Sequence, residues 1–122
     1  MTLTTSLISA TRAEVKSLLD NILTHAAVGT SDTTPSAGQT SLGAEVHRNP
    51  RVGVDKTNPS VIVTSMELLS TQANSNTIRE AGWFNAASSG TMWQRNLVNP
   101  INKTSDVQLF LDTQFTITIT QG

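Results

Sequence analysis

The end of the chain carries the pattern that most limits how this sequence can fold. From residue 107 to residue 120, apolar side chains fall on odd positions and polar ones on even positions, with Phe110 and Thr113 as the two exceptions. Because successive strand residues point to opposite faces of a sheet, this unbroken period of two predicts one long antiparallel strand. One face of the strand is expected in the core, and its threonine-rich face is expected outside.

Further strands are predicted upstream from runs of apolar and β-branched residues. Polar segments at 70–76 and 85–90 separate three of these runs, and the second segment has the length of a hairpin turn. The upstream strands are expected at residues 25–29, 61–69, 77–84 and 92–98.

The segments between these strands read as loops or irregular structure. Residues 30–42 form a polar stretch with a proline and a glycine, and a loop of this length in a small domain is usually functional or disordered. Residues 42–46 predict a helical turn. A proline and a glycine within 47–54 make any strand there irregular, and 99–105 predicts a second loop.

An amphipathic helix is predicted near the start of the chain, at about 11–24. Thr11 and Glu14 have the spacing of a capping box, with Thr11 as the N-cap. Leu7 and Ile8 continue the apolar stripe loosely, which leaves an earlier start open. The four residues with the spacing of one apolar helix face are Val15, Leu18, Leu19 and Ile22.

One helix followed by five or six strands predicts a mainly β domain, an antiparallel β-sandwich or rolled sheet packed against the helix. We expect a single domain over residues 1–122, with its β-rich part at 43–120. Five of 122 residues are aromatic, so the core of one copy should be thin, and oligomerisation is a common way for small domains to bury more surface.

Composition excludes several classes of function. Charged residues make up 14% of the chain against the usual level of about 25%. The net charge of −1 argues against nucleic-acid binding, and the absence of cysteine excludes disulfides and thiolate metal sites. No apolar run approaches the roughly 20 residues of a membrane span, and the N-terminus lacks the features of a secretory signal. We therefore expect a soluble protein made in the cytoplasm.

No motif predicts a catalytic, cofactor or metal site. His25 and His47 are the only histidines, and although Glu45 lies near His47, no metal-binding spacing occurs. The nucleophile elbow G-x-S-x-G is absent, and the glycines at 38 and 43 lack the spacing of a phosphate-binding loop. We expect a protein that is not an enzyme and holds no cofactor.

The hairpin at 77–98 contains the most unusual side chains. Arg79 and Glu80 are adjacent in an otherwise apolar strand, so one of them is expected to be buried in a salt bridge, a role favoured over catalysis. Gly82 indicates a bulge or a close backbone approach. Trp83 and Trp93 lie on opposite arms and are expected to stack as core residues. The alternative is an exposed pair that binds sugar or anchors an interface.

Basic residues cluster once, at Arg48, Arg51 and Lys56. Loop charges in solvent or an intersubunit salt bridge explain them better than nucleic-acid binding does. Glu45 is the nearest acid to Arg48 in the sequence.

Three stretches follow a pattern shared by one protein family. The first stretch resembles ThiavGtG…p…dtaLgnEv.R, the second ItEvGlFn and the third asgGtmfaR. In this chain they are Leu23–Thr30 with Pro35–Val46 and Arg48, then Thr77–Asn85, and then Ala86–Arg95 with Ile101–Thr104 after it.

Together these stretches resemble the tail-collar-fibre-like virion proteins of tailed bacteriophages, in their short free-standing form. The match covers about 23–120. Trp83 stands where the family commonly has Leu, and Gln94 replaces a small residue. The family carries no catalytic site, so the resemblance implies none here.

The resemblance implies an oligomeric structural protein of the virion, synthesised in the host cytoplasm. A capsid-exterior accessory, such as a decoration protein or the base of a head spike, is favoured because the chain is too short to form a fibre shaft. A tail or baseplate adaptor for a fibre is the alternative, and a small carbohydrate-binding module using both tryptophans is a second. Expected partners are further copies, the capsid, the portal, tail or fibre, and a host-surface glycan. The candidate interface residues are Val15, Leu19, Ile22, Glu45, Arg48, Arg79, Glu80, Trp83 and Trp93.

Overall fold

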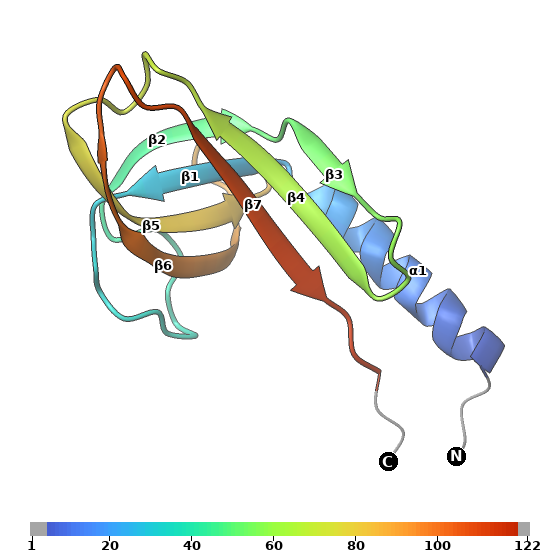
Figure 1. Cartoon of the computed structure of the whole chain (residues 1–122). Coiled ribbons are helices and arrows are strands. Elements are labelled where there is room, and N and C mark those ends of the chain that lie inside the picture. Colours follow the sequence, from blue (N-terminus) through green and yellow to red (C-terminus); the bar gives the residue numbers. More distant parts are fainter. Residues whose placement is uncertain (1–4, 120–122) are drawn as a thin grey trace.

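The computed structural model of the chain describes residues 5–119 (Figure 1). In these residues an N-terminal helix, α1 (Thr5–Ile22), precedes seven strands. The strands are β1 (His25–Gly29), β2 (Glu45–Pro50), β3 (Gly53–Asp55), β4 (Val61–Leu68), β5 (Asn76–Phe84), β6 (Met92–Lys103) and β7 (Leu109–Thr116).

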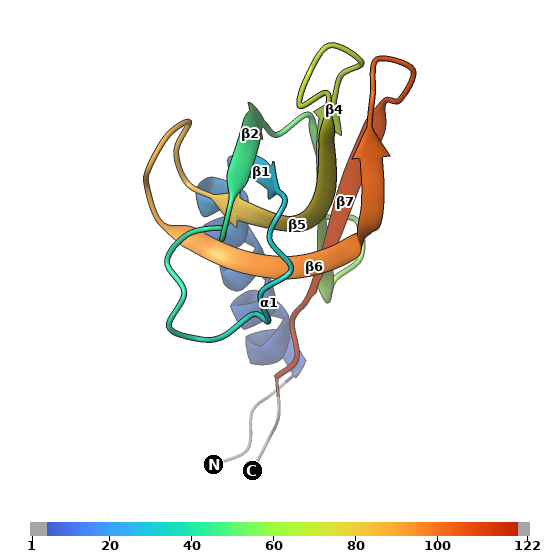
Figure 2. The same ribbon diagram turned by 90° about the vertical axis from the view of Figure 1, so that its left-hand side faces the viewer.

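The strands form two antiparallel sheets, which confirms the predicted mainly β fold with an N-terminal helix. One sheet has the order β2-β1-β5-β6 and the other has the order β3-β4-β7 (Figures 1 and 2). The main core lies between the sheets, where Trp83 and Val28 of the first pack with Met66 and Leu68 of the second. Strands β6 and β7 are each the last strand of a sheet, so each has one edge without a paired neighbour.

The alternating pattern at the end of the chain is confirmed in phase. In β7 the odd positions are partly buried and the even positions are exposed, and β7 pairs with β4 along its whole length. The regular strand is shorter than the predicted 107–120, since it ends at Thr116, and positions 120–122 lie outside the described residues. Phe110 breaks the pattern in sequence and is 68% exposed in space.

The helix starts earlier than the favoured position at residue 11, which is the alternative that Leu7 and Ile8 left open. Helix α1 begins by Thr5 and ends at Ile22, so Thr11 lies inside the helix and is not its N-cap. The Thr11 hydroxyl donates to the Leu7 carbonyl 2.8 Å away, four residues back, a bond that interior threonines make in helices. The C-terminal end is instead fixed by Arg51, whose Nη1 donates to the carbonyls of Asp20 and Leu23.

Two other local predictions are corrected. Residues 42–46 do not form a helical turn, because β2 begins at Glu45. Residues 99–103 are not a loop but the end of β6, which is 12 residues long. A wide irregularity between Ile78 and Glu80 allows Pro100, which has no N–H to donate, to sit inside this strand.

Candidate functional site

The loop after β1 is held to the sheet by a buried carboxylate. Glu80 of β5 is fully buried, and its two oxygens accept backbone N–H bonds from Ser31 at 3.0 Å, Gly43 at 2.8 Å and Ala44 at 2.8 Å. Its fourth donor is Nε of Arg95 at 2.9 Å. We call these five residues the Glu80 cluster. The cluster joins β5, β6 and both ends of the loop at 30–44.

Arg95 extends the same network into the loop. Its side chain is 2% exposed, and its Nη1 donates to the Thr33 carbonyl at 2.7 Å and to Oε1 of Gln39 at 3.3 Å. Arg95 lies opposite Gly82 in the β5–β6 pairing, so it is the diagonal neighbour of Glu80 on the same face. The predicted buried salt bridge therefore exists, but the partner of Glu80 is Arg95 and not Arg79.

The environment of Glu80 lowers its pKa. Burial disfavours the charged form and would by itself raise the pKa. The N–H groups of Gly43, Ala44 and Ser31 and the Arg95 guanidinium together outweigh that effect, so the pKa lies below its ordinary value. The carboxylate is ionised, hydrogen-bonded and enclosed, an arrangement suited to holding a loop in place and closed to a substrate.

Gly29 allows the close approach that the Glu80 cluster needs. A Cβ at this position would lie 2.4 Å from Oε2 of Glu80 and 2.5 Å from the Ala44 carbonyl oxygen. We expect Gly29→Ala to lower the free energy of unfolding by about 1–3 kcal/mol, the usual cost of overpacking. Gly38→Ala is the matched control, since nothing lies within 4 Å of its Cβ position. Urea unfolding measures both, and equal stability of the two variants would contradict the assigned packing.

A second cluster fixes the turn at 85–90. Arg48 of β2 forms a two-bond ion pair with Glu45, at 2.7 and 3.0 Å, and donates to the carbonyls of Ala86 and Ser89. Its guanidinium lies 3.7 Å from the centre of the Phe84 ring. Glu45 and Arg48 therefore pair within one chain.

The two tryptophans do not stack. Trp83 is fully buried in the core, and its Nε1 donates to the Thr113 hydroxyl at 2.8 Å. Trp93 is 50% exposed, because the β5–β6 pairing shifts beside it and leaves it as an extra residue between Gln94 and Met92. The prediction of core packing is confirmed for Trp83 and wrong for Trp93. A surface site that uses both indoles is excluded.

The helix residues proposed for an interface face their own domain. Leu19 and Ile22 pack against the main core, and Val15 is half-buried. Arg51 and Lys56 of the basic cluster bind Asp20 at 2.9 and 2.6 Å, which ties the helix to the β2–β4 region. The hydrogen bond from Lys56 lowers the pKa of Asp20, with a further contribution from the Arg51 charge against the opposing effect of burial. These charges therefore act within the chain.

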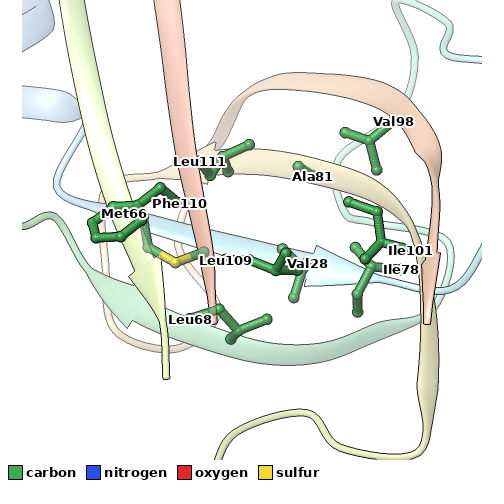
Figure 3. Close-up of a pocket in the computed structure, with 10 residues that line it drawn as sticks. All are labelled: Val28, Met66, Leu68, Ile78, Ala81, Val98, Ile101, Leu109, Phe110 and Leu111. Atoms are coloured by element: carbon green, nitrogen blue, oxygen red, sulfur yellow. The ribbon is translucent and has the colours of Figure 1, made fainter. Parts of the chain in front are cut away.

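An apolar opening between β6 and β7 was not predicted. It is a cavity of about 60 Å³. Figure 3 shows the residues that line it: Val98 and Ile101 of β6, Leu109 to Leu111 of β7, and residues of β1, β4 and β5 such as Val28 and Met66. Ile101 and Phe110 at its edge are 37% and 68% exposed. We call Val98, Ile101 and Leu109–Leu111 the β6–β7 seam. The seam was not predicted because residues 99–105 were expected to form a loop. The strand that residues 99–103 form instead brings Ile101 to the same cavity as Leu109–Leu111.

Neither histidine belongs to a metal-binding cluster among residues 5–119. His47 bonds Asn49 through Nε2 at 2.9 Å, and no group of three His, Asp or Glu residues in this range could hold a metal ion. The helix within the same range is too polar to cross a membrane. The sequence matches no protein-family model and no curated protein. The large apolar side chains exposed on the described part of the chain include Phe110 and Ile101 of the β6–β7 seam and Trp93.

Proposed function

We propose that this chain is a non-enzymatic structural protein of a tailed-phage virion, an oligomeric accessory on the capsid exterior such as a decoration protein or the base of a head spike. The proposal joins the resemblance in the sequence to the surface described above. It assigns the chain a role in assembly, with further copies and other virion proteins as its partners.

The observation that carries the proposal is where the family-like stretches meet. Gly43 and Ala44 come from the first stretch, Glu80 from the second and Arg95 from the third, and all four belong to the Glu80 cluster. Stretches that are far apart in the sequence thus share one fold-determining contact. This shared contact supports the resemblance. It also supports a structural role for these residues, because the fully buried Glu80 carboxylate cannot reach a substrate.

The β6–β7 seam supports assembly. Two strand edges without partners flank it, and such edges with exposed apolar side chains favour pairing with another chain. Phe110, at 68% exposure, is a large aromatic residue of the kind that anchors protein interfaces. We infer that copies of this chain associate through the seam.

We expect the purified chain to form a discrete oligomer at tens of micromolar, and Phe110→Asp to reduce it to the 13.0 kDa monomer. A charge placed in an apolar interface loses its hydration, so association weakens while the fold remains. Gln114→Asp is the control, because it puts the same charge on an exposed position of the same strand. Size-exclusion chromatography with light scattering measures the mass, and circular dichroism checks the fold. A wild-type chain that is already a monomer would contradict association through the seam.

A tail or baseplate adaptor for a fibre is the second location. It uses the same clusters and the same seam, and it differs in the neighbouring protein. Gold-labelled chain bound to particles separates the two, since label on the capsid surface supports the accessory and label at the tail supports the adaptor.

A further inference from the structure

A groove lies beside Trp93, and none of its lining residues belongs to the main core. It has a volume of about 380 Å³ and runs between the loop after β1 and the first residues of β6. Pro35 to Ala37 form one wall, and Trp93 lies along the other. The proposed assembly through the β6–β7 seam makes no use of this groove.

The loop wall is fixed before any ligand binds. Oε1 of Gln39 accepts from the Ser36 N–H, and Nε2 of Gln39 donates to the Thr34 carbonyl at 3.3 Å. Arg95 donates to the same Gln39 oxygen and to Thr33, and Arg95 is itself fixed by Glu80. Because this wall is already ordered, little binding free energy is lost in ordering it when a ligand binds.

Trp93 places an exposed indole along the groove. It is the extra residue of a strand irregularity, a feature that redirects a side chain, and its indole is 50% exposed. Next to it, Nη2 of the enclosed Arg95 guanidinium has no hydrogen-bond partner. The protein encloses this Nη2 atom, so Arg95 holds the loop wall in place and does not face a ligand in the groove.

The charged and neutral residues that line the groove indicate which class of ligand it binds. Among the described residues, Arg95 is the one charged residue that lines the groove, and the Glu80 carboxylate neutralises that charge at 2.9 Å. The remaining polar groups of the lining are neutral: the Ser36 hydroxyl and the side-chain amides of Gln39 and Gln94. We propose that this groove binds a neutral saccharide, with a sugar ring stacked on the Trp93 indole and its hydroxyls paired with the Ser36 hydroxyl and the Gln39 side-chain amide.

The test uses an array of neutral and acidic oligosaccharides, followed by titration of the retained neutral sugars. Indole fluorescence and calorimetry measure the binding of wild type, Trp93→Ala and Leu97→Ala. Leu97 is a matched control because it is an exposed apolar residue of the same strand outside the groove lining. We expect dissociation constants of micromolar to millimolar size, at least a tenfold loss in Trp93→Ala, and no change in Leu97→Ala. Both variants should keep the melting temperature of the wild type.

Several outcomes would overturn the proposal: no sugar retained, only acidic sugars retained, or neutral sugars bound equally well by Trp93→Ala. Retention of a peptide at Trp93 in place of any sugar would also overturn it. None of these outcomes bears on the oligomer or on binding to particles, so the saccharide proposal and the proposed virion function fail separately.

Discussion

Glu80→Gln should lower the free energy of unfolding by about 3–5 kcal/mol, the usual cost of removing one member of a buried ion pair. The amide keeps the size of the side chain but removes its charge, and it turns one acceptor oxygen into an N–H₂ group that faces backbone donors. Arg95, at 2% exposure, is then left buried without a counter-charge. Domains of this size have a total stability of roughly 5–15 kcal/mol, so the loss is a large part of the whole.

Urea unfolding measures this loss, with Glu14→Gln as the control because it makes the same chemical change at an exposed helix position. The double variant Glu80→Gln with Arg95→Met should lose less than the sum of the two single variants, since the residues are in contact. A Glu80→Gln variant as stable as Glu14→Gln would contradict the structural role of the cluster.

The same carboxylate predicts the response of the protein to acid. Because the folded state lowers the pKa of Glu80, its ionised form stabilises the fold above the ordinary carboxylate pKa of 4.5. That contribution is lost as the pH falls from about 4.5 through the lower folded pKa. Unfolding curves between pH 7 and pH 2 should therefore be flatter for Glu80→Gln than for wild type. If the stabilities of Glu80→Gln and wild type fall in parallel with pH, groups other than Glu80 cause the acid sensitivity.

Trp83→Ala should cost about 3–5 kcal/mol, the range seen when a large aromatic residue is removed from a core. The indole is fully buried between the sheets and packs with Val28, Met66 and Leu68. Its removal also leaves the Thr113 hydroxyl without its donor at 2.8 Å. Chemical denaturation followed by circular dichroism measures the effect, because the variant lacks the fluorescent reporter of the core.

Two comparisons make the Trp83 prediction specific. Trp83→Phe keeps much of the apolar volume and loses the hydrogen bond, so it should fall between wild type and Trp83→Ala. Trp93→Ala removes an equal side chain from a half-exposed position and should change stability far less. Equal losses at the two positions would contradict the assignment of one indole to the core and the other to the surface.

A sequence pattern predicted the fold correctly where the spacing of its apolar residues matches the residues that are buried in the structure. The alternation at 107–120 predicted the phase of β7 correctly, because one face of that strand does lie on the core. The helix start was predicted too late because a threonine can act as an N-cap or lie inside a helix. The residues before Thr11 decide between these two roles, and in this chain they are helical. Strand β6 was cut short because Pro100 signals a loop, whereas an unpaired edge tolerates it.

The candidate site was predictable only in part, since it depends on strand register. The pair Arg79–Glu80 indicated that one charge is buried, and Glu80 is. Its partner Arg95 was not singled out, because its diagonal placement depends on the shift in the β5–β6 pairing at Trp93, which the length of the hairpin turn does not give. The three loop N–H donors come from segments 36 to 49 residues distant, which no local pattern could pair with it.

Rebinding to particles is the most direct test of the proposed function. Purified chain is added in increasing amounts to phage particles that lack it, the particles are sedimented, and the bound chain is quantified. We expect saturable binding at a fixed number of copies per particle, with Phe110→Asp binding weakly and Gln114→Asp binding like wild type. A chain that stays in the supernatant as a 13.0 kDa monomer at every concentration would contradict this expectation.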